Sequence, residues 1–213
     1  RYVDEHLDVD HEMLRKHFRG YQELISFSSK YFYGGYLQAI KVRGKPIEEV
    51  IEFSFVETSD KPERYKNINT PEAQFITEML HQMIDENMGQ SVGIITPFRE
   101  QQQFLTRYIF NDSYADRFEE ELRLKIMTFD TCQGEERDVI IYSMVATQTQ
   151  DLLNYIFPVS MDNIEGRVEE ALKVQRLNVG FSRSKEKIHF VLSKPVESYH
   201  GSIGRVLAHY KAL

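Results

Sequence analysis

The sequence has a single cysteine, Cys132, no tryptophan, and only 11 glycines and 6 prolines among 213 residues. One cysteine excludes an internal disulfide, and the low glycine and proline content argues against a low-complexity chain. No apolar run approaches the roughly 18 residues of a membrane-spanning helix. Because 41% of the residues are hydrophobic, we expect a folded protein. The single cysteine and the lack of a long apolar run predict a reducing, cytoplasmic setting and no membrane partner.

The charge balance and the histidine pattern exclude further classes. The net charge of −7 disfavours a surface that attracts nucleic acid over its whole extent, so any such contact must be local. The seven histidines form no HExxH or HxH pattern, and CxxC is absent, so no metal site is predicted. The chain begins at Arg1 and has no secretory segment, which indicates a piece of a longer protein.

Short apolar runs alternate with amphipathic stretches after residue 50, which predicts an α/β fold with a parallel sheet between helices. The expected strands cover residues 50–56, 91–95, 124–129, 139–145 and 188–192. A helix is expected to end near Gly89 and to begin with Thr70 as its cap, Pro71 in its first turn and Glu72 complementing its dipole. Further helices are expected from Thr96 onward and over residues 165–173.

Residues 1–49 differ from the rest, because their pattern is helical and rich in aromatic residues. They end this pattern at Gly34-Gly35, which suits a helix stop. The expected organisation is a lead-in over residues 1–49 and an α/β domain over residues 50–213. No linker separates the two, so we expect one structural unit.

In doubly wound sheets, loops at strand ends carry the ligands, which directs attention to the loops after Ile95, Phe129 and Val145 and to the turn near Arg183. One such loop, residues 133–138, reads Gln-Gly-Glu-Glu-Arg-Asp. It is too charged for a buried turn. A solvated connection and a binding loop are both compatible with this composition.

Three arginines are candidates for binding phosphate, because the guanidinium group is planar and always charged. Arg176 and Arg183 flank an apolar stretch before the last strand, and Arg19 lies in the aromatic lead-in. Taken singly, each is more often a surface ion pair than a ligand.

Four ordered blocks of sequence resemble the last conserved blocks of superfamily 1 helicases, in the branch of the nonsense-mediated-decay RNA helicase and the Okazaki-fragment nuclease–helicase. The blocks are Phe18-Arg19 with Phe32-Tyr33 and Leu37, residues 93–98 (Gly-Ile-Ile-Thr-Pro-Phe), residues 128–138 from Thr128 to Asp138, and Arg176-Leu177-Asn178-Val179 with Ser182-Arg183. The resemblance extends from about residue 14 to residue 193.

The resemblance implies the second RecA-like domain, of P-loop NTPase fold, in an ATP-dependent helicase motor. Such a domain shares clefts for ATP and for single-stranded DNA or RNA with the first RecA-like domain of the same parent chain. By similarity, Arg19 and Arg183 are catalytic arginines that reach the γ-phosphate. The residues implied on the nucleotide side are Gln133, Gly134, Glu136 and Arg176. Among them, Glu136 faces the ribose, and the Gln133 loop couples nucleotide to strand.

The same resemblance implies that Thr96, Pro97 and Thr128 lie on the nucleic-acid side. A threonine hydroxyl can bind a phosphate oxygen. For Thr96 the Thr-Pro context also fits a helix N-cap, and this is the interpretation that we favour.

Five departures from the helicase pattern stand out. No GxxxxGK[ST] phosphate loop and no DExx strand end are present, so the Mg²⁺ ligands lie outside this sequence and the isolated chain is expected to be inactive. Gly20-Tyr21-Gln22 stands where this branch often has Met-His-Pro, and Gly180-Phe181 stands where small or aliphatic residues are usual. The segment of residues 148–170 is also longer than expected between the last two blocks.

The rival hypotheses are an inactive nucleic-acid-binding or scaffold domain of helicase shape, and a nuclease on the same sheet. Retention of both arginines with Gln133 and Glu136 disfavours the scaffold. The absence of a clustered acidic site disfavours the nuclease.

Overall fold

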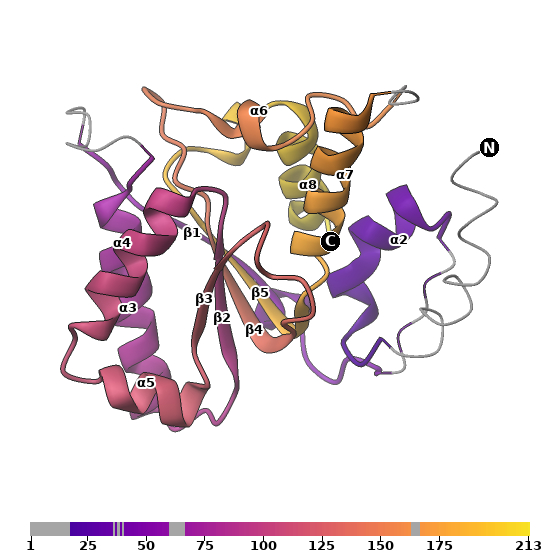
Figure 1. The fold of residues 1–213 in the computed structure, drawn as a ribbon. Coiled ribbons are helices and arrows are strands. Elements are labelled where there is room, and N and C mark those ends of the chain that lie inside the picture. The colour runs from indigo at the N-terminus through magenta and orange to yellow at the C-terminus, as the bar shows by residue number, and fades with distance from the viewer. Residues whose placement is uncertain (1–17, 36, 38, 40, 60–66, 163–166) are drawn as a thin grey trace.

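The computed structural model describes residues 18–35, 37, 39, 41–59, 67–162 and 167–213. The expected α/β fold, a parallel sheet flanked by helices, is confirmed (Figure 1). The sheet has the order β1-β5-β4-β2-β3, and each neighbouring pair is parallel. Its strands are β1 (Ile51–Phe55), β2 (Val92–Thr96), β3 (Lys125–Thr128), β4 (Arg137–Ser143) and β5 (Ser184–Leu192).

Each predicted apolar run overlaps a strand, but β4 begins earlier than predicted, at Arg137, and β5 is longer than predicted. It begins at Ser184 instead of residue 188, because its charged first half pairs with neighbours at the rim of the sheet. Lys187 lies opposite Val139 of β4 and forms an ion pair with Glu52 of β1 at 3.1 Å. The amino half of β5 is charged, so a pattern of apolar residues does not predict it as a strand.

Helices cover both faces of the sheet (Figure 1). One face carries α3 (Thr70–Asp85), α4 (Arg99–Phe110) and α5 (Ala115–Leu122). The other side of the domain carries α2 (Ser26–Phe32), α6 (Leu153–Ile156), α7 (Val168–Gly180) and α8 (Gly201–Lys211). Short 3₁₀ turns lie at Gln22–Ile25, Ile47–Glu49 and Val196–Ser198. Among the helices described, none is long and apolar enough to cross a bilayer.

Two predicted helix starts are wrong. The cap of α3 is Asn69, whose Oδ1 accepts the N–H of Glu72 at 3.0 Å, so Thr70 is already the first helical residue. Thr96 is the last residue of β2 and is fully buried, whereas α4 begins at Arg99 after Phe98. Thr96 is therefore no helix cap, because the chain remains extended beyond it.

The helix expected over residues 165–173 begins at Val168, with Arg167 as the residue before its first turn, and residues 163–166 lie outside the described part. It continues to Gly180 and so carries Arg176 on its surface. The sequence analysis did not identify α8. Two glycines near its start, Gly201 and Gly204, weaken the helical signal.

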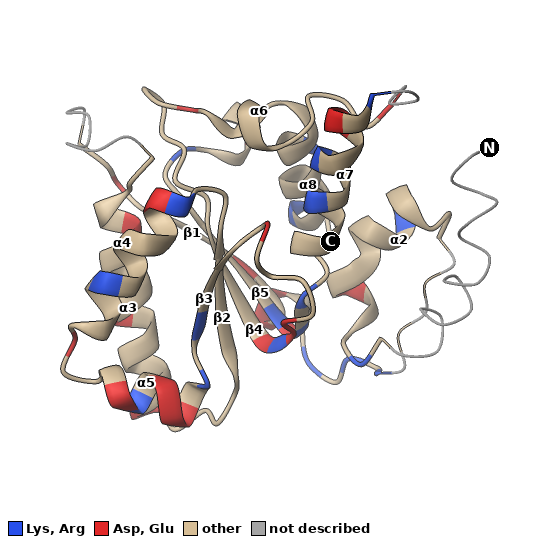
Figure 2. Ribbon diagram, in the orientation of Figure 1, with Lys and Arg blue, Asp and Glu red and all other residues tan. Residues whose placement is uncertain are grey.

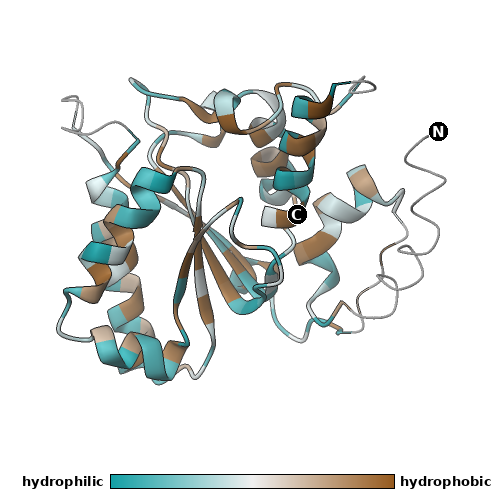
Figure 3. Cartoon of the chain, viewed as in Figure 1, coloured by the Kyte–Doolittle hydropathy of each residue, from teal (hydrophilic) through white to brown (hydrophobic). Residues whose placement is uncertain are grey.

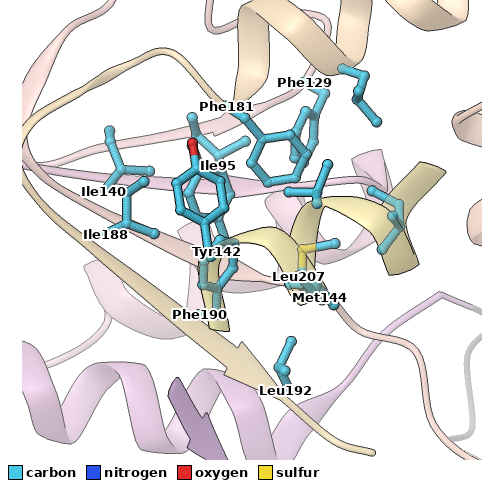
Figure 4. Close-up of a cluster of buried hydrophobic side chains, with 14 of the residues drawn as sticks. Ile95, Phe129, Ile140, Tyr142, Met144, Phe181, Ile188, Phe190, Leu192 and Leu207 are labelled. Carbon is cyan, nitrogen blue, oxygen red and sulfur yellow. The ribbon is translucent and has the colours of Figure 1, made fainter. Parts of the chain in front are cut away.

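The core between the sheet and the helices on the α7 side is rich in aromatic residues (Figure 4). The central parts of the strands are mostly hydrophobic (Figure 3). Phe181 is fully buried and its ring lies 5.1 Å from that of Phe129 and 4.9 Å from that of Tyr142. A Cβ on Gly180 would lie 2.0 Å from the Phe129 ring. The unusual Gly180-Phe181 pair is thus explained, because Phe129 occupies the space of a side chain at position 180 and Phe181 fills the core.

The described part of the lead-in packs on this aromatic core. Phe27 is fully buried, and the hydroxyl of Tyr210 in α8 donates to the Leu24 carbonyl at 2.6 Å. The predicted helix stop is confirmed, since α2 ends at Phe32 and both Gly34 and Gly35 have positive φ. Residues 1–17 of the predicted lead-in lie outside the described residues.

Candidate functional site

The amino ends of β4 and β5 bring together three of the predicted site residues. The N–H of Arg137 donates to the carbonyl of Arg183 at 3.1 Å, which places Glu136 beside the turn before β5. The N–H of Tyr21 donates to the carbonyl of Lys185 at 3.1 Å, which holds the segment containing Arg19 at the same edge. Figure 2 shows acidic and basic residues gathered at these strand ends.

The Arg183 side chain is half-buried and held in place by neutral groups. Its Nε donates to the Val179 carbonyl at 2.9 Å and its Nη2 to Ser182 Oγ at 3.0 Å. Within the described residues, no carboxylate lies within ion-pair distance of either Arg183 or the exposed Arg19. Two guanidinium groups without a counter-charge are suited to binding an anion.

The charged loop of residues 133–138 contains two kinds of acid. Glu135 is paired with Lys125 and Arg137, and the hydrogen bond from Lys125 holds the pKa of Glu135 below its usual value. Asp138 accepts the N–H of Ser91 at 3.0 Å. Glu136 is exposed, and its carboxylate has no partner among the described residues. Glu135 and Asp138 therefore make contacts within the protein, whereas Glu136 is solvated and open to a ligand.

Arg176 has a contact that the sequence analysis missed. Its Nε pairs with Asp130 Oδ1 at 2.6 Å and its Nη1 donates to the Ile156 carbonyl at 2.6 Å, which ties α7 to the loop after β3. Gln133 and Arg176 line the same cleft, of about 320 Å³, between this loop and α7. The structure thus brings these two residues together, with Arg176 engaged by an acid.

Cys132 is fully buried in the core on the α7 side of the sheet. Burial raises the pKa of its thiol to about 11, partly offset by the charge of Arg183. A thiol in this state is a poor nucleophile, and Cys132 packs as a small apolar residue.

The predicted nucleic-acid residues lie at the opposite edge of the sheet. Thr96 and Thr128 end the neighbouring strands β2 and β3, where they are paired in register. Thr128 Oγ1 lies 3.2 Å from Thr131 Oγ1, whereas the buried Thr96 hydroxyl has no partner among the residues described. Pro97 is also buried. The turn near Arg183 precedes β5, so it does not lie at the carboxyl ends of the strands, where it was expected.

A buried carboxylate network at this carboxyl edge was missed because Glu72 looked like a solvated acid in a first helical turn. Glu72 is fully buried and accepts hydrogen bonds from Ser143 Oγ at 2.7 Å, Ser193 Oγ at 2.8 Å and Val145 N at 3.0 Å. Burial raises the pKa of Glu72 to about 7, against the effect of these donors. The only signal in the sequence was the spacing of Asn69 and Glu72.

A second buried polar group lies on the α3 face of the sheet. His189 Nε2 is 2.7 Å from Ser54 Oγ, and its Nδ1 is 3.1 Å from a Glu52 oxygen. Burial lowers the pKa of His189 below that of a free imidazole, so this ring is neutral in the folded protein. Throughout the described residues, no three His, Cys, Asp or Glu side chains form a cluster that could hold a metal ion.

The chain matches the family described as AAA domain over residues 1–194. It is 25% identical over 200 residues to the probable helicase MAGATAMA 3 of Arabidopsis thaliana, which covers 83% of this chain and 22% of that protein. It is 26% identical over 113 residues to helicase sen1 of Schizosaccharomyces pombe, which covers 53% of this chain and 6% of that protein.

A solved structure, the C-terminal domain of a possible DNA helicase from Lactobacillus plantarum WCFS1, aligns with 91% of this chain and 93% of its own at 14% identity and a TM-score of 0.44. The chain spans 22% of the length of one curated relative and 6% of the other. Because the family match covers residues 1–194, the chain belongs to the AAA domain family.

Proposed function

We propose that this chain is the second RecA-like domain of a superfamily 1 helicase, in the branch of the nonsense-mediated-decay and Okazaki-fragment enzymes. The observation that carries this proposal is the pair of arginines at one sheet edge. Arg183 is held by neutral hydrogen-bond partners and Arg19 is exposed, and neither is neutralised by a described carboxylate. This arrangement fits a polyanionic ligand that arrives from a facing domain.

The chemistry follows from charge. In phosphoryl transfer, negative charge on the γ-phosphoryl oxygens is stabilised by cationic groups, and an arginine supplied from a neighbouring domain contributes about 10³ to 10⁵ in rate. Arg19 and Arg183 would contact these oxygens when the first RecA-like domain closes on this edge. Glu136 is exposed beside them and suits a ribose hydroxyl. In the parent protein, the phosphate loop and the Mg²⁺ ligands come from outside this chain.

The loop between β3 and β4 offers a route for coupling. It leaves the carboxyl end of β3 at Thr128 and reaches the amino end of β4 at Arg137, so it connects the two edges of the sheet. Gln133 lines the cleft against α7, and Gly134 turns the loop with a φ of 77°. A shift at the arginine edge would therefore move the residues that follow Thr128, on the proposed single-strand side.

The test is ATP hydrolysis by the parent protein with saturating single strand. Arg183→Ala and Arg19→Ala should each lower kcat by about 10² to 10⁴ with a smaller change in KM, because ground-state nucleotide binding belongs mostly to the other domain. Arg183→Lys should recover little, since an ammonium lacks the planar fork. Glu136→Ala should act mainly through KM.

Arg107→Ala is the matched control, because Arg107 is an exposed arginine of α4 on the other face of the sheet. It should leave both constants unchanged. An unchanged kcat in both the Arg19 and Arg183 variants would refute the proposal and favour the inactive scaffold of helicase shape.

A further inference from the structure

A cleft of about 580 Å³ lies at the carboxyl ends of β1, β4 and β5, away from the arginine edge. Its walls come from the chain segments that follow these three strands. They include Phe55, Thr58, Thr147, Gln148, Thr149 and Ser193. The cleft therefore shares an edge of the sheet with Thr96 and Thr128, which end β2 and β3.

The side chains of this cleft suit a flat, uncharged ring with polar edges. Phe55 ends the edge strand β1 with 56% of its surface exposed, which leaves an aromatic face open to the cleft. The lining also includes the Thr58 hydroxyl and the Gln148 carboxamide, which can donate and accept hydrogen bonds. The hydroxyls of Thr147 and Thr149 lie 3.3 Å apart, and that of Ser193 donates to Glu72.

The same cleft is a poor site for phosphate. Its lysine, Lys194, is paired with Asp151 at 2.6 Å, donates to the Ser198 carbonyl at 3.1 Å and lies over the Tyr199 ring. Among the described lining residues, no other cation is present, and Glu57 adds a negative charge. The ligand should therefore present a base rather than its phosphate here.

The Glu72 network fixes two walls of the cleft. Val145 has a φ of 69°, a strained conformation for a β-branched residue. Two hydrogen bonds hold it there: its N–H donates to Glu72 Oε2 at 3.0 Å, and its carbonyl accepts from Asn69 Nδ2 at 3.0 Å. Thr147 lies two residues after Val145, and Ser193 is itself bound to Glu72. A wall that is already ordered loses little entropy when a ligand binds.

We propose that this cleft is a subsite for one unpaired base of the single strand, stacked on Phe55. The proposal rests on the proposed function, since it assigns part of the strand path. The base of the hydrolysed ATP is a poor candidate, because the nine residues of β5 separate the cleft from Arg183 by about 26 Å. A single nucleotide cannot span that distance.

The experiment measures binding of a fluorescent single strand by the parent protein, by anisotropy at fixed salt. Phe55→Ala should weaken binding about 5-fold or more, because stacking of one base on an aromatic ring contributes about 1 to 3 kcal/mol. Phe55→Trp should restore it. Phe110→Ala, which removes a ring 41% exposed at the end of α4, is the matched control and should have no effect.

Strands with a single abasic position locate the base. For the wild type, one position should be the most sensitive, and Phe55→Ala should abolish that sensitivity. If Phe55→Ala binds every strand as the wild type does, the subsite is refuted while the helicase proposal stands. If the wild type binds no strand, both fail. If a free mononucleotide competes as well as the strand does, the cleft is a nucleotide site and the proposal is wrong.

Discussion

The main-chain N–H of Tyr21 donates to the carbonyl of Lys185 at 3.1 Å, and this hydrogen bond places the Arg19 segment beside the start of β5. The approach is so close that a Cβ on Gly20 would lie 2.8 Å from both Cα and O of Lys185. Glycine at this position, unusual for the helicase branch that the sequence resembles, therefore permits the contact.

We accordingly expect Gly20→Ala to displace Arg19 from the edge where Arg183 lies. In the parent protein this variant should lower kcat more than it raises KM, and overpacking should cost about 1 to 3 kcal/mol of stability. ATP hydrolysis and urea unfolding measure the two effects. Gly44→Ala is the control, because a Cβ there meets no atom within 4 Å. Equal kcat values for the two variants would contradict this account.

The contact between Gly180 and Phe129 predicts a coupled pair. Gly180→Ala should destabilise the fold by about 1 to 3 kcal/mol or more, because the new Cβ would lie 2.0 Å from a buried ring packed against Phe157 and Phe181. Phe129→Leu should also destabilise, but the double variant should lose less than the sum. Urea unfolding of the four proteins gives the coupling energy, and strict additivity would show that the two positions are independent.

Glu72 predicts an unusual dependence of stability on pH. Its pKa is raised from its ordinary value of 4.5 to about 7, so the folded state holds a proton that the unfolded state has lost. The contribution of Glu72 to the free energy of unfolding is therefore fully present below about pH 4.5 and falls by about 3 kcal/mol as the pH rises to about 7. Urea unfolding of the wild type and of Glu72→Gln at several pH values measures this contribution as the difference between the two profiles.

His189 opposes this slope, because its lowered pKa makes the folded state bind fewer protons than the unfolded state near and below pH 6.5. The wild-type profile should therefore be shallow between pH 5 and 7. Glu72→Gln removes one of the two slopes, so the variant should become more stable as the pH rises through this range. A variant profile parallel to that of the wild type would show that Glu72 does not titrate there.

The chain alone should fold without hydrolysing ATP, because the sequence has no phosphate loop and its described residues contain no cluster for a metal ion. Circular dichroism tests folding, and phosphate release tests activity. Turnover that disappears in Arg183→Ala would show that the active site lies within this chain.

The strands could be predicted because they depend on local sequence, whereas the roles of the arginines stay a prediction. Val92–Thr96 is a short apolar run, and the arginines belong to ordered blocks. What could not be predicted depends on contacts between distant segments. Tyr21 pairs with Lys185, and Glu72 becomes a buried acceptor only when Ser143 and Ser193 converge on it. An acid near a helix start otherwise indicates a solvated residue.

We expect Arg183 to stabilise the γ-phosphoryl group in the transition state of its transfer, and binding of a transition-state analogue tests this most directly. The parent protein is titrated with ADP plus aluminium fluoride, which mimics the transferring phosphoryl group, and with ADP alone. We expect Arg183→Ala to weaken binding of the analogue by about 10² or more while the affinity for ADP stays within a few-fold. Equal losses for both ligands, or no loss for either, would contradict the account.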